Sequence, residues 1–322
     1  MTKRLRQLSG KDVSLALAAL PVLVLLAIAP ETFALFWPHD IPALGALFFV
    51  LFLLGFDLLG FPKGKLEWTR RRKILAAVTV VVGVLYFAAA APGQSLTSVI
   101  YSVGRTAGAR GDVRHPNSES FLTATYFADF VVYLTVLTVV LFNKNTIRRV
   151  VTPFVFSVGM MIFYMLDAFF PYDQLWFLQF WANSIVAAVA FLAKLFGLPI
   201  YGFANHLTII GKHVNCHLVV YWPSVGVESM LMFSLVMAVM VVRLQAPRNR
   251  KLVYAAIGIA GTVFLNVIRI FLIAYYGYAY ATTCNQVDNF HNTIGLFLLP
   301  FWIVVFVASI VKVEDRFAKL SA

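Results

Sequence analysis

Apolar residues fall in long uninterrupted runs along this chain, and short polar segments separate the runs. A run of about 18 apolar residues is long enough to cross a bilayer as a helix. Such runs lie near residues 13–36, 41–60, 74–91, 121–142, 150–169, 224–243, 252–274 and 291–311. The pattern predicts an all-α, polytopic membrane helical bundle of about eight transmembrane helices. The alternating segments of about ten residues that are typical of membrane β-barrels are absent from the sequence.

Composition and charge agree with a membrane protein. Hydrophobic residues make up 61% of the 322 positions and the mean hydropathy is +0.84, which exceeds the values of a soluble domain. The net charge of +12 would suit nucleic acid. However, most lysines and arginines cluster between the apolar runs, at 3–11, 61–73, 143–149, 243–251 and 312–319. Because basic loops stay in the cytoplasm, we expect a multi-pass cell-membrane protein with cytoplasmic termini and no nucleic-acid partner.

One segment does not fit simple alternation of the spans. Residues 170–223 start and end outside on this topology, yet 174–198 is apolar enough to cross once. Either 174–198 lies at the interface or re-enters, or 199–222 makes an extra crossing. We favour the first arrangement, because Lys194 suits a helix that is packed on protein or lies at the interface.

The external segments have further expected features. Residues 206–212 and 216–222 read as a small external hairpin. Residues 92–120 read as a long external loop with three arginines, either solvated or in contact with lipid phosphates or an acidic substrate. There is no internal repeat, so 1–322 is predicted to be a single integral membrane domain with its chemistry-bearing motifs within 216–295.

The run Val219 to Met230, VVYWPSVGVESM, places polar groups at the external start of a span. Pro223 suits the first turn of a helix, where its missing N–H costs nothing. Ser224 follows it, and Gly226 lets another chain or a substrate approach closely. Glu228 comes four residues after Ser224 and therefore lies on the same helical face, one turn deeper.

Two further spans carry polar groups at the same membrane level. Asn266 and Arg269 are three residues apart and share a face in the outer half of one span. An arginine there is costly unless it is paired or faces a polar cavity, and Glu228 is its natural partner. His291 begins the last span at its external end. The topology thus predicts that a hydroxyl, a guanidinium and an imidazole converge.

These residues carry a resemblance to a known family. The run Ser-Val-Gly-Val-Glu-Ser-Met from Ser224 resembles the Cys-Ser-Gly-Ile-x-Ser motif of the exosortase/archaeosortase membrane transpeptidases. Asn266 to Ile270 resembles the second motif of that family, and His291, followed by Gly295, resembles the third. The likeness covers roughly the C-terminal 150 residues. Because Ser224 stands in place of the cysteine, the chain resembles the serine-bearing thaumarchaeosortase-like subgroup.

The resemblance implies a reaction and a set of roles. Ser224 would be the nucleophile, His291 the general base and acid, and Arg269 the oxyanion stabiliser. Supporting roles would fall to Glu228, Asn266 and Gly226. The substrates would be surface proteins with a C-terminal tail of motif, membrane helix and basic cluster. The acyl group would pass to an external amine, expected to be a lipid, or to water. No cofactor or metal is expected, and the oligomeric state is not predicted.

Two other functions compete with this interpretation. A transporter could use Asp57, Asp129 and Asp167, which lie in or near spans, although no inverted repeat is visible. An inactive protein could bind the same tails without cutting them. At the level of single residues, Ser224 could be only a helix N-cap and His291 only an interfacial cap. Arg269 and Glu228 could form only a structural pair.

Two cysteines and three histidines leave alternatives open. Cys216 lies eight residues before Ser224 and is a rival nucleophile, whereas Cys284 lies seven residues before His291. Both are expected on the oxidising side, so they can form a disulfide that pins the hairpin against the neighbouring loop. His206, His213 and His217 with Cys216 suggest a metal site, but Cys216 points elsewhere in either helix or strand, which disfavours it.

Overall fold

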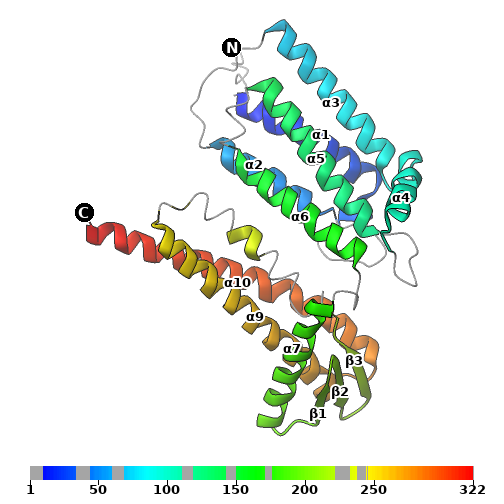
Figure 1. Ribbon diagram of the computed structural model, residues 1–322, viewed down its shortest axis with the longest axis vertical. Coiled ribbons are helices and arrows are strands. Elements are labelled where there is room, and N and C mark those ends of the chain that lie inside the picture. The colour runs from blue at the N-terminus through cyan, green and yellow to red at the C-terminus, as the bar shows by residue number, and fades with distance from the viewer. Residues whose placement is uncertain are drawn as a thin grey trace, which may run out of the picture. The chain divides into compact units, whose positions relative to one another are not determined.

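The computed structural model describes residues 10–33, 44–59, 69–110, 119–142, 150–170, 176–221, 233–237, 244 and 246–321. The chain divides into two compact units, Met1–Pro171 and Tyr172–Ala322 (Figure 1). Each unit is described by itself. The single membrane domain expected from the sequence stays a prediction.

Unit 1 consists of helices, and five of those described coincide with the first five apolar runs. Its elements are α1 (Gly10–Ile28), the 3-10 turn η1 (Pro30–Phe33), α2 (Ala46–Leu59), α3 (Arg70–Ala90), α4 (Ser95–Ala107), α5 (Glu119–Leu141) and α6 (Val151–Phe169). Large aromatic side chains fill the space between them, since Phe87, Tyr126, Phe127 and Phe130 are almost completely buried. The predicted spans of this half therefore correspond to α1, α2, α3, α5 and α6.

The helix α4 lies within the segment that the sequence predicted to be a loop. One side of α4 is buried at Thr97 and Gly104, and the Thr97 hydroxyl donates to the carbonyl of Ala91 at 2.6 Å. The other side exposes Val99 and Val103. Tyr101 donates to the Glu119 carboxylate. Burial, reinforced by this hydrogen bond, raises the pKa of Tyr101, so its hydroxyl remains a donor. The segment is thus an amphipathic helix docked on unit 1.

The three aspartates of unit 1 are engaged in contacts between elements. Asp57 accepts a hydrogen bond of 3.2 Å from the backbone N–H of Thr152, in the first turn of α6, where a negative charge is favoured. Asp129 accepts 2.6 Å from the Tyr86 hydroxyl, and the Ser120 hydroxyl donates to Asp167. These contacts explain the aspartates as connectors between helices, which weakens the transporter interpretation.

Unit 2 combines long helices with a small sheet. Its described elements are α7 (Trp176–Leu195), β1 (Ile200–Phe203), β2 (His206–Ile210), β3 (Asn215–Val219), α9 (Arg248–Ala279) and α10 (Cys284–Ser321). The sheet is antiparallel in the order β1-β2-β3, with Ile209 opposite both Ile200 and Cys216. The predicted hairpin corresponds to β2 and β3, and the structure adds β1 at its edge.

One core joins α7, the sheet and α9. Val186 and Val189 of α7 pack in a cluster that includes Leu207 and Ile209 of β2 and Ile270 of α9. A Cβ on Gly202 of β1 would lie 2.8 Å from Val186 and 3.0 Å from Ala190, so glycine lets β1 approach α7. The helix predicted over 174–198 is therefore packed on protein along one side.

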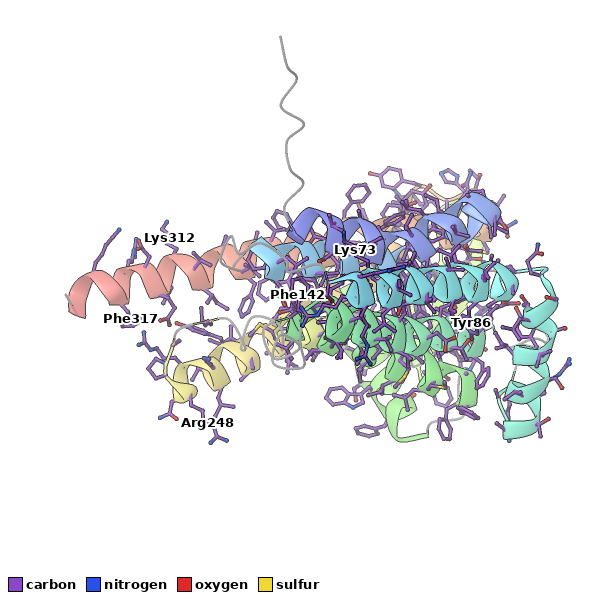
Figure 2. All side chains as sticks on the ribbon, turned by 90° about the horizontal axis from the view of Figure 1, so that it is seen from above. Lys73, Tyr86, Phe142, Arg248, Lys312 and Phe317 are labelled. Atoms are coloured by element: carbon purple, nitrogen blue, oxygen red, sulfur yellow. A yellow bond between two sulfur atoms is a disulfide. The ribbon has the colours of Figure 1, made fainter. Side chains whose placement is uncertain are left out.

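Far from the sheet, α9 and α10 are held together by a polar contact. The start of α9 and the end of α10, where Arg248, Lys312 and Phe317 lie, belong to one end of unit 2 (Figure 2). Arg250 forms an ion pair of 3.2 Å with Glu314, and its guanidinium lies 4.4 Å from the centre of the Phe317 ring. This contact holds the two helices side by side.

Four described helices are long and apolar enough to cross a membrane, namely α3, α5, α6 and α9. Shorter apolar stretches lie at 13–28, 46–58 and 180–195. The predicted span at 224–243 falls mostly outside the described residues, apart from the helical residues 233–237. The total of about eight spans stays a prediction.

Candidate active site

The α9–α10 pair brings Arg269 and His291 to one level. A turn at 280–283 joins the two helices, which lie side by side (Figure 1). Arg269 is ten residues before the end of α9, and His291 is seven residues after the start of α10. At 1.5 Å per residue, they lie about 15 Å and about 10 Å from that turn. The helical hairpin itself therefore places them opposite each other.

Arg269 and His291 are hydrogen bonded. The Nη2 atom of Arg269 lies 2.6 Å from Nε2 of His291, and both side chains are half-buried. A guanidinium has donors but no acceptor, so the lone pair of Nε2 must accept this bond. His291 is then a neutral imidazole with its proton on Nδ1. A neutral imidazole beside a fixed positive charge is a suitable arrangement for acid–base chemistry.

Asn266 lies one helical turn before Arg269 and is only 4% exposed. Neither its carboxamide oxygen nor its nitrogen makes a hydrogen bond to any residue of the described ranges. A buried amide without a partner costs about 1–3 kcal/mol, and such groups are uncommon outside functional sites. Asn266 thus adds a polar amide to the same helical face as Arg269.

Aromatic and aliphatic packing supports the helix around His291. The rings of Tyr276 and Phe290 are stacked, with centroids 4.3 Å apart and an interplanar angle of 9°. Val287, one turn before His291, is fully buried against Ile273 of α9. These contacts fix the first turns of α10 on the end of α9. Nothing in the local sequence pattern pairs Tyr276 with Phe290, so these contacts are not predictable from the sequence.

Cys216 and Cys284 form a disulfide with an S–S distance of 2.08 Å. It joins the second residue of β3 to the first residue of α10. Cys216 is 1% exposed, and neither cysteine of the chain is free. Nucleophilic attack requires a thiolate, so Cys216 is not a nucleophile in this state.

The histidines of the sheet are not arranged as a metal site. His217 forms a hydrogen bond of 3.1 Å between Nδ1 and the Thr208 hydroxyl. Among the described residues, no group of three or more histidine, cysteine, aspartate or glutamate side chains could hold a metal ion.

Ser224, Gly226 and Glu228 lie outside the described residues, so the structure does not test the predicted contact between Glu228 and Arg269. Val220, which precedes Ser224 by four residues, is fixed by two hydrogen bonds to Asn205. The N–H of Val220 donates to the carbonyl of Asn205 at 2.8 Å, and the Asn205 side chain donates to the carbonyl of Val220 at 3.3 Å. The role of Asn205 is not predictable from the sequence, because an asparagine in a turn does not indicate that it bonds to Val220, 15 residues away.

Residues 64–308 match the family model for transmembrane exosortases. The match covers well over half of the chain and spans Ser224, Arg269 and His291. The chain belongs to the transmembrane exosortase family. The matched region begins at residue 64, so it includes most of unit 1 as well as unit 2. The likeness therefore extends beyond the C-terminal part in which the motifs lie.

Membership in the family explains the general character of this exosortase. Exosortases are generally peptidases or transpeptidases that act in protein sorting at the membrane. The several apolar helices agree with a multi-pass membrane protein. No curated protein and no solved structure matches the chain.

Proposed function

We propose that this exosortase is a serine transpeptidase that cuts the C-terminal tails of surface proteins. Ser224 is the nucleophile, His291 the general base and acid, and Arg269 the electrostatic stabiliser. The observation that carries the proposal is the hydrogen bond of 2.6 Å between Arg269 and His291, which come from two different helices. It joins the two charge-handling groups that the reaction needs.

The reaction proceeds through an acyl-enzyme. The Ser224 hydroxyl oxygen attacks the carbonyl carbon of the scissile bond while His291 accepts the hydroxyl proton. The C–N bond then breaks, and His291 returns the proton to the leaving amine. The acceptor amine attacks the resulting ester, gives a proton to His291, and forms a new amide. The ester bond breaks, and the Ser224 oxygen recovers its proton.

The Arg269–His291 pair is the resting arrangement in this mechanism. Its hydrogen bond occupies the Nε2 lone pair, which His291 needs to accept the serine proton. The pair therefore opens when substrate binds, and the guanidinium turns to the carbonyl oxygen on which negative charge develops. Asn266 supplies an amide group on the same face of α9 for the substrate backbone.

Covalent geometry supports the assignment of Ser224. Ser224 follows Val220 by four positions, and four extended residues reach at most about 14 Å. Val220 packs in the same cluster as Ile270, which directly follows Arg269. Chain length thus limits Ser224 to within about 14 Å of a residue that belongs to the same core as the neighbour of Arg269.

The proposed substrates carry a tail of short motif, membrane helix and basic cluster, and the acceptor is an external amine, which we assign to a lipid. The disulfide supports an external site, because disulfides persist in oxidising compartments. An external site at membrane depth suits a scissile bond just outside the membrane helix of the substrate. The serine-bearing thaumarchaeosortase-like subgroup is the part of the family that we propose for this chain.

Cleavage of a co-expressed tripartite-tail protein tests the proposal. The wild type is compared with Ser224→Ala and with the double variant Cys216→Ala/Cys284→Ala. We expect Ser224→Ala to abolish cleavage, a loss on the order of 10⁶-fold as for other serine nucleophiles. Residual cleavage in the double variant then excludes Cys216 as the nucleophile. Full activity of Ser224→Ala would overturn the assignment, and tail binding without wild-type cleavage would identify an inactive binder.

A further inference from the structure

The disulfide joins the two chain segments that lead to the proposed nucleophile and the proposed base. Cys216 precedes Ser224 by eight residues, and Cys284 precedes His291 by seven. Seven residues are about two helical turns, so Cys284 and His291 lie on the same face of α10. One covalent bond thus connects the start of the segment that leads to Ser224 with the start of the segment that leads to His291.

Each segment is rigid between the disulfide and the site, as far as the described residues extend. On the β3 side, Cys216 pairs with Ile209, and the paired hydrogen bonds of Asn205 hold Val220. On the α10 side, the chain is continuous helix from Cys284, with Val287 buried on the way. A displacement at the cysteines is therefore transmitted to His291 instead of being absorbed by a loop.

A second contact attaches the turn between β2 and β3 to α9. The N–H of Lys212, in the turn between β2 and β3, donates to the carbonyl of Tyr278 at 2.9 Å. The sheet is thus fixed to the C-terminal end of α9, the helix that also carries Arg269. The disulfide completes a closed arrangement in which β3, α9 and α10 hold one another.

We propose that the Cys216–Cys284 disulfide positions His291 relative to Arg269, and that it is required for the hydrogen bond between them. Its sulfur atoms are bonded to each other and take no part in the proposed chemistry, so the cysteines are positioning residues. The proposal rests on the proposed function only in naming His291 as the reacting base. The geometry of the Arg269–His291 pair can be measured without any cleavage.

Chemical modification of His291 tests the proposal directly. Diethyl pyrocarbonate acylates neutral imidazole nitrogens, and mass spectrometry of the His291 peptide measures the rate. The purified full-length protein is compared with Cys216→Ala/Cys284→Ala between pH 5.5 and 8. His206, an exposed histidine at the start of β2, is the internal reference. Ile209→Val, a mild truncation on the neighbouring strand, controls for general loosening of the sheet.

Loss of the disulfide should raise the His291 modification rate about fivefold relative to His206, as expected when one hydrogen bond is lost. Its pH profile should move at the same time, whereas Ile209→Val should leave both unchanged. An unchanged His291 rate in a folded double variant overturns the proposal, as does an equal rise in Ile209→Val. If the double variant does not fold, reduction and reoxidation of the wild type give the same comparison.

The activity measurement separates this proposal from the proposed function. If the chain is a transpeptidase, the double variant should lose about 100-fold in kcat with little change in KM, as for a misplaced catalytic group. If Ser224→Ala fails to affect cleavage, the proposed function is wrong, but the modification experiment still decides whether the disulfide positions His291.

Discussion

The two units use polar side chains in different ways. In unit 1, the described polar contacts between helices satisfy a carboxylate or a carbonyl with a hydroxyl or N–H donor, as Tyr86 joins Asp129 and Tyr133 joins the carbonyl of Leu17 at 2.6 Å. At the candidate site of unit 2, by contrast, a guanidinium faces an imidazole, and a buried amide one turn away has no partner among the described residues.

Contacts such as Tyr86–Asp129 hold helices together, whereas a contact such as Arg269–His291 is suited to chemistry. A hydroxyl with a carboxylate satisfies both groups and favours one packing of two helices. An arginine with a histidine is stable only while the imidazole is neutral, so protonation or substrate binding can change it. Unit 1 therefore resembles a scaffold, and unit 2 carries the candidate site.

Among the changes that test this contrast between the units, the largest effect is expected from His291→Gln. Glutamine keeps an acceptor for Arg269 but cannot take up a proton, so kcat should fall about 10²–10⁴-fold. The comparison between units predicts that Asp129→Asn, in the middle of unit 1, leaves kcat close to that of the wild type. Steady-state cleavage of a tail substrate measures both variants. Equal losses in the two variants would show that the contrast between units has no functional meaning.

Arg269→Lys should have the next largest effect. Lysine keeps the positive charge but lacks the planar set of donors, so it cannot reproduce the geometry around a developing oxyanion. We expect a loss of about 10²–10³-fold in kcat, with unfolding temperature nearly unchanged. A lysine variant with wild-type kcat would mean that only charge is needed at this position.

Gly211→Ala tests how tightly the sheet of unit 2 is held. A Cβ at this position would lie 2.3 Å from the Val214 carbonyl oxygen and 2.9 Å from that of Gly277. Both are backbone atoms, so the turn must move, at a cost of about 1–3 kcal/mol of unfolding free energy.

The matched control for this change is Gly55→Ala in unit 1. Its nearest neighbour would be a Leu15 methyl at 3.5 Å, which is ordinary contact. Alanine there should be neutral or stabilise the helix by up to about 1 kcal/mol. Thermal unfolding in detergent measures both variants, and equal stability of the two would contradict the close contact at Gly211.

The smallest effect is expected from Tyr86→Phe. The change removes one hydrogen bond between α3 and α5, and such bonds in membrane helices average about 0.6 kcal/mol. Unfolding free energy should fall by about that amount while kcat stays constant. A large loss of activity would assign a functional role to unit 1 that its contacts do not suggest.

The sequence identified the candidate site through residue type and membrane level. An arginine three residues after an asparagine inside an apolar run is costly, so its position alone indicated a polar contact. The expected contact with Glu228 stays a prediction, and the structure shows His291 as a hydrogen-bond partner of Arg269. Likewise, the oxidising compartment indicated the Cys216–Cys284 disulfide without any knowledge of the fold.

Two elements were hidden from sequence reasoning. Helix α4 is rich in serine, threonine and glycine and follows a turn at Gly93, so its pattern resembles a loop. Strand β1 has only four residues and begins five positions after the last residue of the apolar helix α7, so its apolar residues merge with that helix in the pattern. Packing against α5, and pairing with β2, decide these two structures.

The sequence by itself determined the membrane character, the helical segments and the family-like motifs, because hydrophobicity and helical spacing act over a few neighbouring residues. The tertiary structure alone decided that Tyr276 meets Phe290 and Asn205 meets Val220, and that Arg269 and His291, which the topology only brings to one level, are directly hydrogen bonded. These pairs depend on how helices and strands pack after they form, and their energies are shared among many contacts. No local pattern in the chain records that outcome.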